Sequence, residues 1–102
     1  MLAHALLFAA LVQSPTASVD TSRTAFTECL RREMRSDLEA KVTPADFTAA
    51  LASKCDTSRK AFRAANIAAD RASGDSEAVA AESADMQIAD YHQSFAEKFK
   101  DF

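Results

Sequence analysis

CLRREMRSDLEAKVTPADFTAALASKC, residues 29–55, begins and ends on the two cysteines of the chain. Cys29 and Cys55 lie at nearly equal distances from Thr43-Pro44, which marks a turn between two stretches of helical periodicity. In an antiparallel pair of helices, residues at equal distances from the turn lie at the same height. The spacing therefore predicts an αα-hairpin whose helices are joined by a Cys29–Cys55 disulfide.

Other roles for the two cysteines fit the sequence less well. Their spacing is far from a C-x-x-C redox motif, and a zinc site would need further ligands that the sequence does not offer. An unlinked pair of core cysteines is the remaining alternative. A disulfide would indicate an oxidising compartment.

The composition favours an all-α fold. Alanine recurs throughout, glycine occurs once and proline twice, and no run of β-branched or aromatic residues alternates with a period of two. A chain of 102 residues supports one domain. We therefore expect an elongated three-helix bundle, formed by the disulfide-linked αα-hairpin and a third long helix, with lengthwise packing of the coiled-coil kind.

The first two helices have predictable ends. The first should begin with Asp20 as its N-cap and run to about Val42. The second should begin with Thr43 as N-cap and Pro44 at the first helical position, and run unbroken to Ala72, about 43 Å at 1.5 Å per residue. One stripe at steps of four and three would pack this helix on its neighbours: Leu51, Cys55, Ser58, Phe62, Ala65, Ala69 and Ala72.

The third helix should follow a tight corner. Gly74 suits the left-handed position after a helix, and Asp75 or Ser76 would cap the next one. Antiparallel to the second helix, its aromatic end would reach the level of Phe47 and Leu51, where we expect core packing. Its stripe is Ala81, Ala84, Ile88, Tyr91, Phe95, Phe99 and Phe102.

The same aromatic end is the candidate partner surface. A slim bundle has little area to cover large aromatic side chains, so an exposed patch there would bind a second copy or another protein of the cell envelope. The candidate residues are Tyr91, Phe95, Phe99 and Phe102. A peripheral membrane-surface role is a weaker alternative, because this part of the chain is acidic and anionic lipid would repel it.

Residues 1–18 are predicted to be a secretory signal peptide, and residues 19–102 a single helical domain. An apolar run over 1–12 is followed by small residues that suit cleavage between Ser14 and Ser18. A membrane-spanning helix needs about 20 residues, so no transmembrane anchor is expected. Since no Lys or Arg precedes the run, a fraying apolar helix is the alternative. The prediction is export to the periplasm or the extracellular space.

No pattern in the sequence indicates catalysis, a cofactor or a metal. His92 is the one histidine beyond the predicted signal peptide, and no triad surrounds it. A single glycine excludes a Gly-rich phosphate loop. Arg59, Lys60 and Arg63 form the strongest basic cluster, but neighbouring carboxylates dilute it and no aromatic residues are interleaved, so nucleic acid is not an expected partner.

These observations predict an exported helical module with a binding or structural role and no catalytic activity. The alternatives are self-association or envelope-protein binding through the aromatic helix, and contact with a membrane surface.

Overall fold

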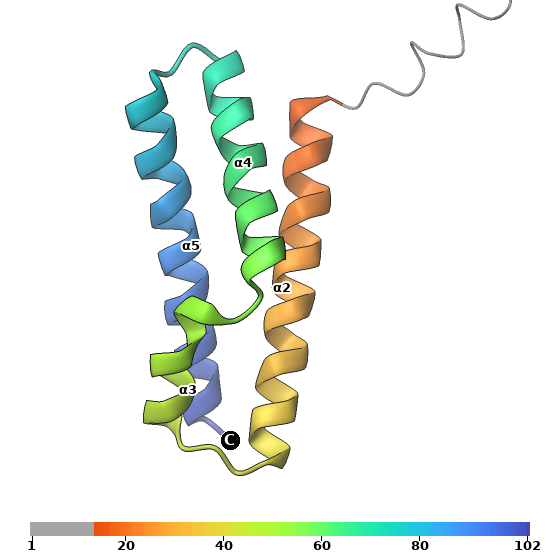
Figure 1. The fold of residues 1–102 in the computed structure, drawn as a ribbon, viewed down its shortest axis with the longest axis vertical. Coiled ribbons are helices and arrows are strands. Elements are labelled where there is room, and N and C mark those ends of the chain that lie inside the picture. Colours follow the sequence, from red (N-terminus) through yellow and green to blue (C-terminus); the bar gives the residue numbers. More distant parts are fainter. Residues whose placement is uncertain (1–13) are drawn as a thin grey trace, which may run out of the picture.

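The computed structural model describes residues 14–102, which form an elongated all-α bundle (Figure 1). Within this range α2 lies beside α4 and α4 beside α5, while the short α3 packs on α5. The elements are α2 (Pro15–Glu39), α3 (Pro44–Ala50), the 3-10 turn η1 (Leu51–Ser53), α4 (Asp56–Ala72) and α5 (Glu77–Lys100). The all-α bundle is confirmed, but the expected second helix is divided into α3 and α4.

The first helix, α2, begins earlier than the sequence pattern predicted. Ser14 is its N-cap, with the hydroxyl accepting a hydrogen bond from the Ala17 N–H at 3.2 Å, and Pro15 occupies the first helical position. This Ser-Pro pair is a stronger start signal than a single aspartate. Asp20 lies inside the helix instead, where it pairs with Arg23 at 2.8 Å.

The predicted boundary at residue 18 falls within the first turn of α2. Most of the predicted signal peptide, residues 1–13, lies outside the described residues. A cut between Ser14 and Ser18 would remove part or all of the turn that starts the helix. The signal peptide and its cleavage position stay predictions.

The turn after α2 follows the predicted signals more closely. The helix ends at Glu39 rather than Val42, because Lys41 adopts the left-handed conformation with a φ of 58°. Thr43 then caps α3 with Pro44 at its first position, as predicted. The Thr43 hydroxyl accepts a backbone hydrogen bond at 3.2 Å.

The prediction of one unbroken helix from Pro44 to Ala72 is wrong. After η1, Lys54 is extended with a ψ of 146°, and Cys55 is left-handed with φ 58° and ψ 38°. Cys55 therefore precedes α4 as its N-cap instead of lying inside a helix. We call residues 51–55 the joint.

The corner before α5 matches the prediction. Gly74 has a φ of 105°, a positive value that residues with a side chain rarely adopt. Ser76 caps α5, with its hydroxyl accepting from the Val79 N–H at 3.2 Å. Of the two cap candidates, Ser76 is therefore the one used.

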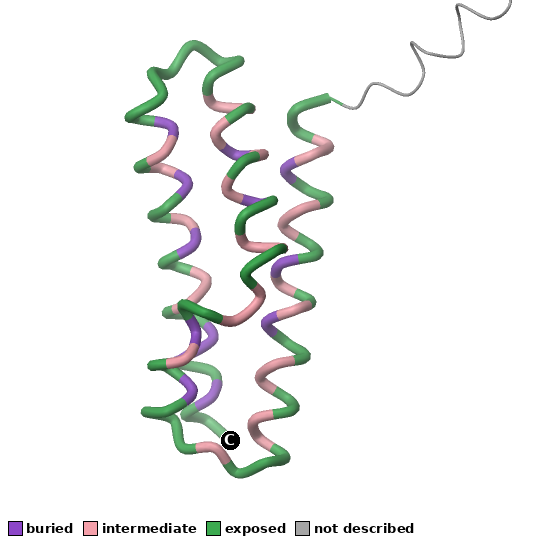
Figure 2. Tube along the Cα trace, viewed as in Figure 1, coloured by how far each residue is buried: buried purple, intermediate pink, exposed green. Residues whose placement is uncertain are grey.

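The core lies between the helices along the length of the bundle (Figure 2). At its centre the Phe26 ring lies 5.8 Å from Phe62 and 6.0 Å from Tyr91. Further along, the Phe47 ring of α3 stacks on Phe99 of α5 at 4.1 Å, so the aromatic end of α5 does reach the predicted level. The buried apolar residues are Val19, Phe26, Leu30, Phe47, Leu51, Phe62, Ala80, Ala84, Ile88, Phe95, Ala96 and Phe99.

Candidate functional site

The joint carries the disulfide predicted from the cysteine spacing. Cys29 of α2 and Cys55 are bonded, with their Cα atoms 5.9 Å apart. The alternative of two unlinked core cysteines is therefore excluded. The bond fixes the break between η1 and α4 to the middle of α2, the longest helix described.

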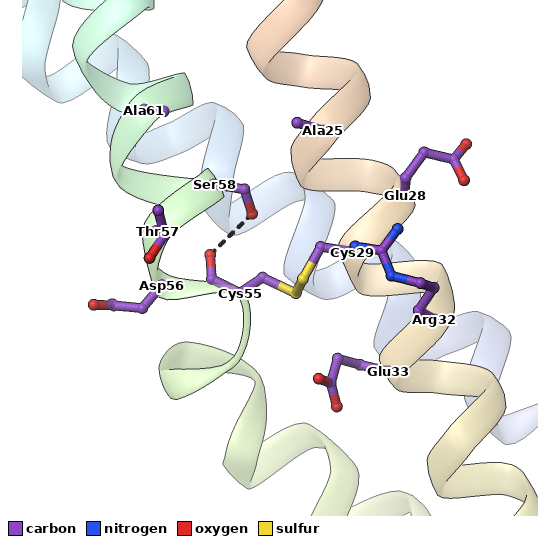
Figure 3. Close-up of a pocket in the computed structure, with 10 residues that line it drawn as sticks. All are labelled: Ala25, Glu28, Cys29, Arg32, Glu33, Cys55, Asp56, Thr57, Ser58 and Ala61. Carbon is purple, nitrogen blue, oxygen red and sulfur yellow. Dashed lines mark hydrogen bonds between the residues drawn. A yellow bond between two sulfur atoms is a disulfide. The ribbon is translucent and has the colours of Figure 1, made fainter.

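Both cysteines line an open groove of about 750 Å³ between α2 and the beginning of α4 (Figure 3). The rim of the groove carries charges of both signs, including Glu28, Arg32 and Asp56. Asp56 points away from the disulfide (Figure 3). The disulfide therefore lies beside an open groove. The charged side chains that line this groove do not point toward one common position.

Lys54 ties the joint to α2 by electrostatics. Its ammonium group lies 3.1 Å from a Glu33 oxygen and 3.3 Å from an Asp37 oxygen. The hydrogen bond to Glu33 is the main cause that raises the pKa of Lys54 above its ordinary value, and Asp37 adds to it. The sequence offered no signal for this pairing, because lysine and carboxylates are far apart in the chain.

The basic cluster predicted on the second helix is paired with acids. Asp56 binds both Lys60, at 2.9 Å, and Arg59, and these two cations, Lys60 first, lower the pKa of Asp56. Arg63 donates two hydrogen bonds, at 2.7 and 3.3 Å, to Asp85 of α5 and lowers the pKa of that carboxyl. The cluster is therefore not a free basic surface.

His92 lies against the centre of the core. Its ring packs on Phe26 at 6.0 Å in an edge-on arrangement. Its Nε2 atom and the Nε atom of Arg59 are buried, and neither has a hydrogen-bond partner in the described part of the chain. Burial, and then the positive charge of Arg59, lower the pKa of His92, which favours the neutral imidazole.

Acidification from pH 7 to pH 5 should destabilise the fold through His92. The unfolded chain takes up the proton at the ordinary histidine pKa of about 6.5, whereas the folded chain takes it up only at lower pH. The stability is therefore complete above about pH 6.5 and falls as the pH approaches the lowered pKa. Urea denaturation at several pH values measures how the free energy of unfolding changes with pH. The His92→Gln variant should show a smaller change between pH 7 and pH 5 than the wild type. An equal change in the variant contradicts this role of His92.

The four candidate partner residues do not share an exposed surface. Phe95 and Phe99 are buried in the core, and Tyr91 is half-buried, with its ring edge-on to both Phe26 and Phe62. The four residues therefore do not form one exposed patch, because Phe95 and Phe99 are covered. Phe102, with 80% of its surface exposed, is the exception, and a partner role there stays a prediction.

A buried polar contact joins α4 to α5 in the alanine-rich half of the bundle. Asn66 is only 5% exposed and donates from Nδ2 to the Phe62 carbonyl oxygen at 2.8 Å. Gln87 donates from Nε2 to the Asn66 Oδ1 at 3.2 Å. Sequence reasoning missed both residues, although the position of Asn66, one turn after Phe62 on the packed side, was a readable signal.

The outer side of α5 carries exposed apolar side chains. Val79 is 54% and Met86 61% exposed, and both line a shallow hollow with Glu82 and Asp90. The residues that line this hollow lie in the N-terminal part of α5.

The comparisons with known proteins found no relative. No protein-family model, no curated protein and no solved structure matches the chain. Within residues 14–102, no three His, Cys, Asp or Glu side chains are grouped so that they could hold a metal ion. Over the same residues, none of the helices has the length and apolar character needed to cross a membrane.

Proposed function

We propose that the protein is an exported binding module without catalytic activity. The observation that carries this proposal is the Cys29–Cys55 disulfide, because structural disulfides persist in oxidising compartments and are rare in the cytosol. The apolar run over residues 1–12, followed by small residues, agrees with export. The exposed apolar side chains on the outer side of α5 are what favour a binding role.

The outer side of α5 is the binding surface that we propose. Val79 and Met86 are two of the three large hydrophobic side chains that the described chain leaves exposed, and Glu82 and Asp90 lie beside them. An apolar stripe with acidic neighbours suits a protein surface that is apolar and basic. Binding of a second copy through the same stripe is the second candidate, favoured by this exposure alone.

Photo-crosslinking at single positions tests this surface. A photoreactive residue is placed at Met86 in one variant and, as a control, at Ser36 on the exposed side of α2 in another. Irradiation of the intact producing cells should give one discrete protein adduct from position 86 and none from position 36. An adduct at twice the chain mass indicates self-association, and a different mass indicates another protein. Equal adducts from both positions, or none from position 86, contradict the proposed surface.

A further inference from the structure

We propose that the Cys29–Cys55 disulfide is a thiol-exchange site that controls the shape of the joint. With the disulfide intact, the helix is interrupted between η1 and α4. After reduction by a dithiol, the joint becomes helical, and α3, η1 and α4 merge into one helix from Pro44 to Ala72. This inference goes beyond the proposed binding function and does not depend on it.

A continuous helix would use the same packed residues as the interrupted helix. Phe47, Leu51 and Phe62 are buried on the two sides of the break. In a continuous helix, residues spaced by three and four positions share one face, so the same residues would again lie along one stripe. That stripe is Phe47, Leu51, Cys55, Ser58, Phe62, Ala65 and Ala69. Straightening therefore does not require a polar side chain to replace an apolar one in the core.

The conformation of Cys55 also favours straightening of the joint. Its φ of 58° lies in the left-handed region, which is unfavourable for a residue with a side chain. No side chain caps α4 at this position, so no cap compensates for the conformation. The residues around it, including Ala50, Leu51, Ala52 and Lys54, are good helix formers. Local preference thus favours a helix where the structure has a break.

The disulfide and a set of ion pairs hold the joint to α2. The disulfide fixes Cys55 to Cys29 with their Cα atoms 5.9 Å apart. A second link from the joint to α2 is the pairing of Lys54 with Glu33 and Asp37. Ion pairs at a protein surface contribute little to stability, so these pairs oppose straightening only weakly. The covalent bond is therefore the stronger of the two restraints.

The exchange itself is a two-step reaction with a dithiol, such as the two-cysteine site of a thiol oxidoreductase. One thiolate of the dithiol attacks a sulfur of the Cys29–Cys55 pair; this forms a mixed disulfide and releases the other cysteine as a thiolate. The second thiol of the reductant then displaces the protein sulfur. The reductant leaves as a disulfide, and Cys29 and Cys55 together gain two electrons and two protons. The open groove beside both cysteines gives the reductant access.

Nuclear magnetic resonance of the full chain before and after reduction with dithiothreitol tests the proposal. Reduction should move the Cα chemical shift of Lys54 from an extended to a helical value. It should also produce Hα–HN contacts between residues three positions apart without interruption from Thr48 to Lys60. Aromatic signals of Phe26 and Tyr91 report whether the core stays folded.

Two matched variants separate the effect of the break from the loss of the bond. Cys29→Ser with Cys55→Ala removes the disulfide and favours a helix, so it should show the same helical signals as the reduced chain. Cys29→Ser with Cys55→Gly removes the disulfide but tolerates the left-handed conformation, so it should keep the broken joint to a greater extent. An extended Lys54 in both the reduced chain and the alanine variant overturns the proposal. Loss of the core signals in both also overturns it, since the merged helix would then not form.

Discussion

Replacing Phe26 by alanine should lower the free energy of unfolding by about 3–5 kcal/mol. Phe26 is fully buried, and its ring contacts Phe62, Tyr91 and His92 from both other long helices of the bundle. Truncation leaves a cavity where three helices meet, and a domain of this size has a total stability of about 5–15 kcal/mol. Chemical denaturation followed by circular dichroism measures the loss.

Phe102→Ala is the matched control for this prediction. Its ring is 80% exposed, so the same chemical change should alter the free energy of unfolding by less than about 0.5 kcal/mol. Equal losses from the two substitutions would contradict the position of Phe26 at the centre of the core. A large loss from Phe102→Ala alone would instead indicate that the C-terminal ring packs in solution.

Removing the disulfide should have the second largest effect on stability. The bond links residues 26 positions apart, and the chain-entropy model assigns about 3.5 kcal/mol to a loop of this length. Where residue 55 can become helical, it leaves the unfavourable left-handed conformation that Cys55 has in the oxidised chain. This change offsets about 1–2 kcal/mol of the loss. The Cys29→Ser, Cys55→Ala variant should therefore lose roughly 2 kcal/mol.

Urea denaturation of this variant and of the oxidised chain, under identical conditions, measures the difference. Reduced wild-type protein provides the control, because it has the same sequence as the oxidised chain. A loss greater than the full chain-entropy value of about 3.5 kcal/mol would show that the disulfide holds native contacts in place beyond its effect on the unfolded chain. No loss in either would show that the bond contributes nothing to the fold.

The helix ends that could be predicted are those marked by local chemistry. Thr43 with Pro44, Gly74 and Ser76 each act through their own backbone or a hydrogen bond three residues away. The disulfide could be predicted for a similar reason. In a helical hairpin, residues at equal sequence distances from the turn lie at the same height along the two helices. The start of α2 was misplaced because Ser14, the true cap, falls in the segment interpreted as a signal peptide.

The break at the joint could not be predicted from periodicity. The stripe through Leu51, Cys55 and Phe62 is the same whether the chain is continuous or broken, so the pattern does not distinguish the two. The ion pairs of Lys54 with Glu33 and of Arg63 with Asp85 depend on how helices lie side by side. Such pairs join residues more than 20 positions apart, and one sequence gives no signal for them.

The burial of the aromatic end of α5 could be predicted in part. The expectation that it meets Phe47 is confirmed by the Phe47–Phe99 stack. The expectation of an exposed patch failed for Phe95 and Phe99 because both are buried, and α3, which precedes the joint, packs on this part of α5. A slim bundle covers these rings with a short extra helix.

We propose that the protein is exported and that its two cysteines are joined in one disulfide. The most direct measurement is the mass of the protein isolated from its native source, with free thiols alkylated under denaturing conditions before and after reduction. We expect no alkylation before reduction, two alkylated cysteines after it, and a mature chain that begins between Ser14 and Val19. A chain that keeps Met1 and carries two free thiols before reduction would contradict the claim.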